Sequence, residues 1–144
     1  MAFFGLLKSK EKKLVIKWEK DHLAMVELAG KIMTAYTGGK LVVAKNHIRE
    51  LGSLASSHVM NEDIEFYKLM KHTQLDPSTI TSIKDFQAGF KKVKLALLTF
   101  LAKYGKEDVP LTEEFFEEFS EIVGVLSERI EFEENNLYEL LKVR

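Results

Sequence analysis

A few polar residues that could do chemistry lie on otherwise apolar helix faces. His58 and Glu62 are four residues apart, so they share one face of a helix, and that face is the apolar one. His22 lies on the apolar stripe of an earlier segment, and Glu133 lies on the stripe of the last. A buried carboxylate is costly unless it pairs with a cation or binds a metal ion. Because bundles build metal sites from imidazoles and carboxylates on facing helices, these four residues are candidate ligands.

An internal repeat gives the two halves of the chain equivalent polar positions. Residues 58–70 read HVMNEDIEFYKLM and residues 129–141 read RIEFEENNLYELL. In this alignment Glu62 corresponds to Glu133, and Tyr67 corresponds to Tyr138. The repeat indicates two helix pairs of common origin, with carboxylates at the same depth in each pair.

The elements that must position these residues are four amphipathic helices. Breaks occur at Gly38-Gly39, at Asp76-Pro77 and from Gly105 to Pro110, and apolar residues recur every three or four positions between them. The pattern predicts helices at about residues 12–37, 40–72, 78–104 and 112–142. We expect an all-α, antiparallel up-down-up-down four-helix bundle over residues 14–142, preceded by an apolar and basic arm, residues 1–13.

Composition narrows the class of protein. The chain has 144 residues, a formal net charge of −1 and no cysteine. The missing cysteines exclude disulfides, thiolate metal sites and a thiol nucleophile, and the charge argues against nucleic-acid binding. With no phosphate-binding glycine loop and no plausible Ser/His/acid set, we expect a protein that is not an enzyme. With no membrane span and no signal peptide, the expected location is the cytoplasm.

Charge is unevenly distributed along the chain. Lysines dominate residues 1–20, and acidic residues dominate from Glu107 onward. The acidic run is either a solvated helix face or a surface for a basic partner, and we expect a protein partner. The arm, residues 1–13, is either a frayed terminus or a segment that docks on the bundle, on a partner or weakly on a membrane surface.

The polar pattern resembles the hemerythrin-like, or HHE cation-binding, family. Members carry His on the first helix and His-x-x-x-Glu on the second, and the pattern recurs in the second half. The matching residues here are Asp21-His22, His58, Glu62-Asp63, Phe66-Tyr67, Glu133-Glu134 and Leu137-Tyr138. The resemblance covers about residues 14–141 and implies a hemerythrin-like bundle with iron ligands in its core.

Two departures from the family pattern argue against a two-iron centre. Arg129 stands where the family has His on the fourth helix, and residues 78–104 contain no His. We therefore expect at most one Fe, Mn or Zn ion, held by His22, His58, Glu62 and Glu133.

A metal-free core is the other interpretation of the same residues. Arg129, and with it Lys94, would replace the charge of the metal ion by pairing with Glu62 or Glu133. A chain with such a metal-free core resembles, more loosely, the Rsd/AlgQ anti-sigma factor family. The residues that carry this resemblance are Trp18, Arg129, Glu133 and Glu134.

Two functions follow from these two interpretations. The first is a divergent hemerythrin-like bundle with an incomplete ligand set and no cofactor, acting as a regulatory protein-interaction module. The alternative is a metal-binding protein with a mononuclear non-heme iron site or another reduced site, serving as an oxygen or metal sensor or as a storage protein. The sequence favours the first, because two expected His positions are replaced and one of the replacements is a cation.

Overall fold

The computed structural model of the chain describes residues 10–72 and 75–142. Residues 1–9, most of the predicted arm, lie outside that part. Within it the chain is all-helical, with no strand. The elements are α2 (Lys10–Thr37), α3 (Leu41–His72), α4 (Pro77–Tyr104), α5 (Glu113–Phe132), the π-helical turn η1 (Glu133–Leu137) and α6 (Tyr138–Lys142). The predicted helical bundle is thereby confirmed.

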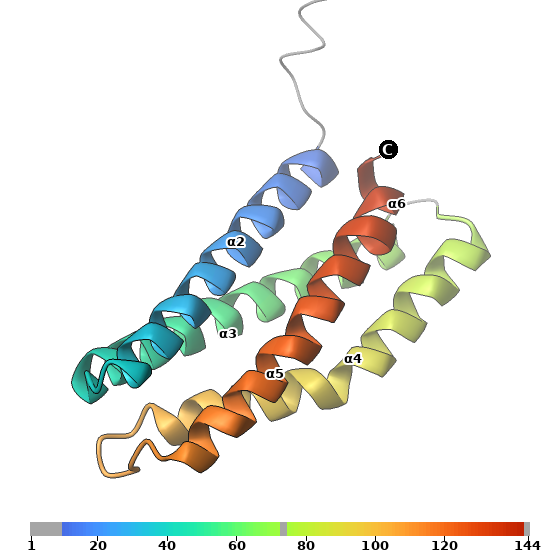
Figure 1. The fold of residues 1–144 in the computed structure, drawn as a ribbon. Coiled ribbons are helices and arrows are strands. Elements are labelled where there is room, and N and C mark those ends of the chain that lie inside the picture. Colours follow the sequence, from blue (N-terminus) through green and yellow to red (C-terminus); the bar gives the residue numbers. More distant parts are fainter. Residues whose placement is uncertain (1–9, 73–74, 143–144) are drawn as a thin grey trace, which may run out of the picture.

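The predicted breaks end the helices for local chemical reasons. Gly39 takes a φ of +75° in the turn between α2 and α3, a conformation that favours glycine. Pro77 begins α4, where its missing N–H costs no helical hydrogen bond. Thr112 caps α5 by accepting a hydrogen bond from the Phe115 N–H. The turn after α2 and the loop after α4 lie at the same end of the molecule (Figure 1).

Helix bounds differ from the prediction in two places. α2 begins at Lys10, so the last four residues of the predicted arm belong to the first helix. The predicted fourth helix is not one continuous α-helix, because η1 separates α5 from α6. A π-helical turn adds a residue to the helical repeat, and such turns occur frequently at functional sites.

The apolar core forms two clusters with polar residues between them. One cluster includes Met25, Leu51 and Leu97, and the other includes Trp18 and Phe66. His22 lies between Trp18 and Met25 along α2 and is itself 3% exposed. The polar residues therefore interrupt the core in the middle of the bundle.

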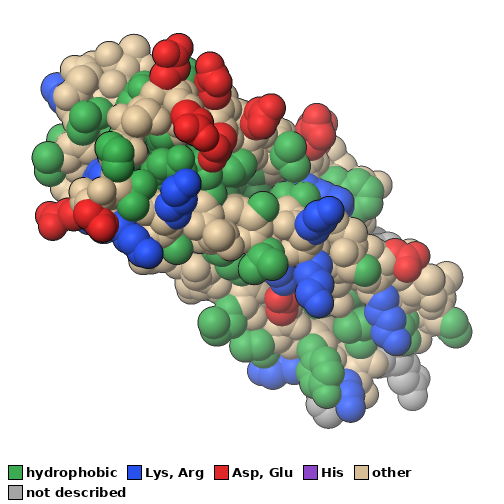
Figure 2. Space-filling model, turned by 90° about the horizontal axis from the view of Figure 1, so that it is seen from below, with side chains coloured by type: hydrophobic (Ala, Val, Ile, Leu, Met, Phe, Trp, Pro, Cys, Tyr) green, Lys and Arg blue, Asp and Glu red, His purple; other side chains and the backbone are tan. Residues whose placement is uncertain are grey.

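The surface carries the uneven charge seen in the sequence. Acidic side chains gather along one edge of the face shown in Figure 2, and basic side chains lie across the adjoining surface. The exposed acids of α5 include Glu113, Glu117, Glu121 and Glu128. No helix in the described part of the chain is both long and apolar enough to cross a membrane.

Candidate metal centre

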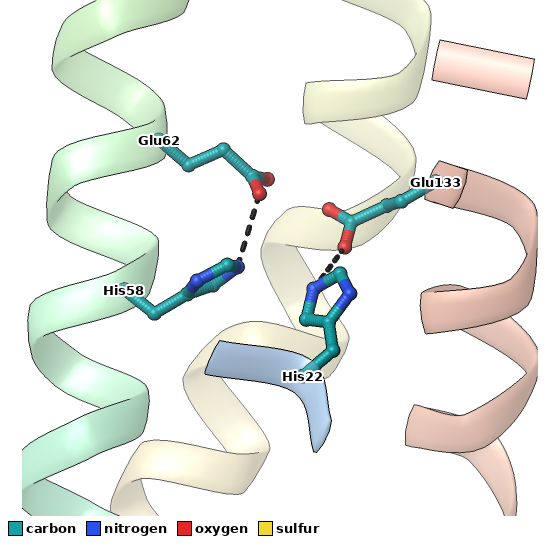
Figure 3. Close-up of side chains that lie close together, drawn as sticks. All are labelled: His22, His58, Glu62 and Glu133. Carbon is teal, nitrogen blue, oxygen red and sulfur yellow. Dashed lines mark ion pairs between the residues drawn. The ribbon is translucent and has the colours of Figure 1, made fainter. Parts of the chain in front are cut away.

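Four buried side chains converge from three parts of the bundle. His22 comes from α2, His58 and Glu62 from α3, and Glu133 from the first residue of η1 (Figure 3). Each is at most 4% exposed. One potential ligand atom from each residue lies within 4.8 Å of the other three. The structure thus brings together the four ligands that the sequence predicted.

Both imidazoles are oriented by carboxylates outside the cluster. His22 Nδ1 lies 2.9 Å from Glu134 Oε2, and His58 Nδ1 lies 3.0 Å from Asp21 Oδ2. Each ring therefore points its Nε2 atom inward. A carboxylate on the outer nitrogen is the usual arrangement for a metal-bound histidine, because it sets the tautomer and raises the basicity of the ligating nitrogen.

The inner nitrogens face the two buried carboxyl groups. His22 Nε2 lies 3.1 Å from Glu133 Oε1, and His58 Nε2 lies 3.0 Å from Glu62 Oε2 (Figure 3). The Tyr138 hydroxyl donates a hydrogen bond to Glu62 Oε2. These contacts leave Glu133 Oε2 buried without a hydrogen-bond partner in the described structure, whereas the contact of His58 Nε2 with Glu62 is an ion pair without good hydrogen-bond geometry.

Aromatic residues form one wall of the cluster. The Trp18 ring centroid is 5.4 Å from that of Tyr138, and the Trp18 Nε1–H donates to Asn61 Oδ1 at 2.9 Å. The Tyr138 ring stacks against His22 at 5.7 Å. Burial, followed by the nearby Glu62 and Glu133 carboxyls, raises the pKa of Tyr138 far above its usual value, so the phenol stays protonated and can keep donating to Glu62.

The two buried glutamates have opposite pKa shifts. Burial and the Glu62 charge raise the pKa of Glu133 to about 11. Burial alone would also raise the pKa of Glu62, but His58, Glu133 and Tyr138 together hold it below its ordinary value. Without a metal ion, Glu62 is therefore ionised and Glu133 is protonated.

The histidines differ in the same way. Burial lowers the pKa of His22. Burial acts in the same direction on His58, but the Glu62 and Asp21 carboxylates outweigh it and raise the pKa of His58. In the metal-free cluster His58, beside the ionised Glu62, is therefore the imidazole more readily protonated, and His22 the less readily protonated one.

The donor set fits a transition-metal ion. Two imidazole nitrogens, which are borderline ligands, and two carboxylates, which are hard oxygen ligands, together suit Fe, Mn or Zn. Ligands bonded to one ion at about 2.0–2.2 Å lie at most about 4 Å apart, so small side-chain movements would close the four atoms around an ion. Glu133 Oε2, which has no hydrogen-bond partner, and His58 Nε2, which has only its ion pair with Glu62, are the buried atoms that an ion would satisfy.

Arg129 does not enter this cluster, which corrects the predicted charge replacement. Its Nη2 donates to the Gly89 carbonyl oxygen at 3.0 Å, and its guanidinium lies 5.8 Å and 5.7 Å from the ring centroids of Phe86 and Phe90. A Cβ at position 89 would lie 3.5 Å from Nη2, an ordinary van der Waals distance, so Arg129 packs directly over this part of α4. Here Arg129 keeps part of its hydration and avoids the cost of full burial.

Lys94 also lies outside the cluster. Its Nζ is 2.7 Å from Asp63 Oδ2, and the Asp63 side chain is 49% exposed. This contact joins α4 to α3 near the surface, where an ion pair contributes little to stability. Neither predicted counter-charge therefore forms an ion pair with Glu62 or Glu133 among the ion pairs of the described residues.

Sequence reasoning gave no role to three residues that shape the site. Asp21, Glu134 and Tyr138 belong to the pattern that resembles the hemerythrin-like family, but spacing alone did not show their contacts. Asp21 directly precedes His22 and Glu134 directly follows Glu133 in the chain. This adjacency to candidate ligands was the only sequence signal for their roles. The direction of Tyr138 depends on η1, which no local sequence signal marked.

Comparison of the chain with protein-family models, with characterised proteins and with solved structures gave no match. The resemblance to the hemerythrin-like family and the looser one to the Rsd/AlgQ family therefore stay predictions.

Proposed function

We propose that this chain is a metal-binding protein that holds a single Fe, Mn or Zn ion in the core of an antiparallel, hemerythrin-like four-helix bundle. The ligands are His22, His58, Glu62 and Glu133. The observation that carries the proposal is the orientation of both imidazoles, whose outer nitrogens contact Glu134 and Asp21 while their inner nitrogens face Glu133 and Glu62.

One ion is proposed, because α4 supplies no ligand to the cluster. The sequence of α4 contains no histidine, and the cluster draws its four ligands from α2, α3 and η1. Phe90 of α4 belongs to the apolar cluster next to the site. Four ligands suit one ion with room for a further small ligand, and this arrangement is compatible with sensing or storage.

The metal-free regulatory module is the less supported function. It depended on Arg129 as an internal counter-charge, and Arg129 contacts Gly89, Phe86 and Phe90 instead. A regulatory role and a protein partner stay predictions, as do the cytoplasmic location and the absence of enzymatic activity.

The test is metal titration of protein purified without a histidine tag. After treatment with a chelator, we expect Fe(II), Mn(II) or Zn(II) to bind at one ion per chain, measured by calorimetry and elemental analysis. Glu62→Gln and His22→Ala should abolish binding. His47→Ala is the matched control, since His47 lies on α3 outside the cluster, 3.3 Å from Glu50.

Two results would count against the proposal. If the wild-type chain binds none of these ions, the metal-free module becomes the better explanation. If it binds two ions per chain, the ligand set has been assigned too narrowly.

A further inference from the structure

An apolar pocket lies beside the polar cluster and plays no part in the proposed metal site. It has a volume of about 220 Å³ and is lined by residues of α2, α3, α4 and α5. Apart from Gly30 and Ser127, every lining residue is hydrophobic. Met25 lies one helical turn after His22, and Ile130 lies one turn before Glu133, so the pocket and the cluster are neighbours along both helices.

The pocket runs from the surface into the core. Leu51, Leu97 and Phe119 line it and are at most 2% exposed, so they form its floor. Val26 of α2 lines it too and is 54% exposed, and Ser127 of α5 is also exposed. The entrance therefore lies between α2 and α5, and the inner end reaches side chains of α3 and α4.

An empty pocket of this kind is unfavourable. Its apolar walls face solvent when nothing fills it, and covering apolar surface is favourable. Water is a poor occupant, because it needs two to four polar partners and the lining offers almost none. No atom lies within 4 Å of a Cβ placed at Gly30, so packing does not require glycine there. A side chain at position 30 would instead occupy the entrance.

Size and charge define the occupant. A dry apolar cavity of about 150 Å³ holds benzene, so the volume here suits a molecule slightly larger than one aromatic ring. Apart from the Ser127 hydroxyl, the lining offers no polar side chain, and it contains no charged residue. A charged ligand would therefore enter the pocket without a charged or hydrogen-bonding partner, which is costly and favours an uncharged one.

We propose that the pocket between α2 and α5 is a binding site for a small, uncharged apolar molecule of about the size of a single aromatic ring. The inference goes beyond the proposed metal site and does not rest on it.

Toluene is the probe, and benzoate is its anionic counterpart of similar size. Binding to the full chain is followed by NMR chemical-shift titration in the presence of a chelator, so that metal binding cannot influence the result. We expect saturable binding of toluene, with shifts centred on the lining residues. Benzoate should bind at least about tenfold more weakly.

Gly30→Leu should fill the entrance and weaken toluene binding by about tenfold or more. Gly124→Leu is the matched control, because Gly124 is also an exposed helical glycine with open space around its Cβ position, but it does not line the pocket. Ser127→Leu blocks the entrance from the opposite helix and replaces Gly30→Leu if that variant does not fold by circular dichroism.

Three results would overturn the proposal. The first is no saturable toluene binding to the wild-type chain. The second is equal weakening by Gly30→Leu and Gly124→Leu. The third is self-association that excludes toluene and is lost in Gly30→Leu, which would assign the pocket to a second copy of the chain. If the chain binds no metal ion, the toluene result still stands, because toluene binding is measured in the presence of a chelator.

Discussion

His22 and His58 are buried histidines whose orientation is set by two carboxylates at the edge of the core. Asp21 is partly exposed and so is Glu134, with side chains 17% and 32% accessible, yet each contacts the outer nitrogen of a buried imidazole. Their charges reach the core without being buried there. The inner nitrogens are thereby directed to the place where Glu62 and Glu133 meet.

Removal of either outer carboxylate is the first prediction. Asp21→Asn and Glu134→Gln keep the shape of the side chain but remove its charge, so we expect each to weaken metal affinity about 10–100-fold. Calorimetric titration with Zn(II) measures the effect. Asp63→Asn is the control, because Asp63 follows a ligand in sequence but contacts Lys94. Equal affinities for all four proteins would contradict the assigned roles of Asp21 and Glu134.

The pH dependence of metal affinity is the second prediction. Metal ligands must be deprotonated, and the pKa of Glu133, raised to about 11, means that this carboxyl holds a proton at neutral pH, while the raised pKa of His58 adds competition from protons as the pH falls. Protons therefore compete with the ion, and affinity should rise from about pH 6 to about pH 8, by up to about tenfold per pH unit for each proton released.

Calorimetry in buffers of different ionisation enthalpy counts the protons released on binding. We expect at least one proton at neutral pH, because the pKa of Glu133 is raised to about 11, and a larger count at lower pH, where His58 is protonated as well. A pH-independent affinity with no proton release would show that these ligands are already ionised in the metal-free protein.

At the scale of the helices, Arg129 joins α5 to α4 and has no role in the core. Its contacts are one hydrogen bond to the Gly89 carbonyl oxygen and the faces of two phenylalanine rings. The third prediction is that Arg129→Ala lowers the free energy of unfolding by about 1–2 kcal/mol. Loss of a partner for a buried carboxylate would instead cost about 3–5 kcal/mol.

Urea unfolding of Arg129→Ala and of Glu128→Ala separates these two cases. Glu128 is exposed on the same helix, so its replacement should change stability very little. A loss above about 3 kcal/mol for Arg129→Ala would place the guanidinium in the core, against Glu62 or Glu133.

The helices and their inward faces could be predicted from the sequence, whereas the details of the last helix could not. Periodicity placed His22, His58, Glu62 and Glu133 on apolar stripes, and all four are buried. Periodicity does not give the rotation of a long, partly buried side chain, so Arg129 was assigned to the wrong neighbours. The turn η1, Glu133–Leu137, was not predicted, because apolar periodicity does not distinguish a π-helical turn from a continuous α-helix.

At the scale of the whole molecule, an ion at this site would connect elements far apart in sequence. The ligands come from α2, α3 and η1, and they lie between the two apolar clusters. Anything that binds the folded state but not the unfolded state stabilises the fold by mass action. The site should therefore stabilise the whole bundle, including the junction between α5 and α6.

The fourth prediction is a metal-dependent rise in melting temperature. At a free ion concentration of about 100 times Kd the stabilisation is about 2.7 kcal/mol, or about 5–10 °C for a chain of this size. Differential scanning calorimetry with and without Zn(II) measures it, and a chelator should reverse it. His22→Ala should show no rise, and an equal rise in that variant would mean that the ion binds elsewhere.

Trp18 has a consequence for how this protein can be observed. It is the chain's sole tryptophan, it is fully buried, and its ring lies 5.4 Å from Tyr138, which contacts Glu62 and His22. All indole fluorescence from the protein therefore originates at the wall of the polar cluster. An open-shell ion such as Fe(II) quenches nearby indole emission, whereas closed-shell Zn(II) does not. The intrinsic fluorescence of Trp18 can therefore report ion binding without a label, and it distinguishes open-shell from closed-shell ions.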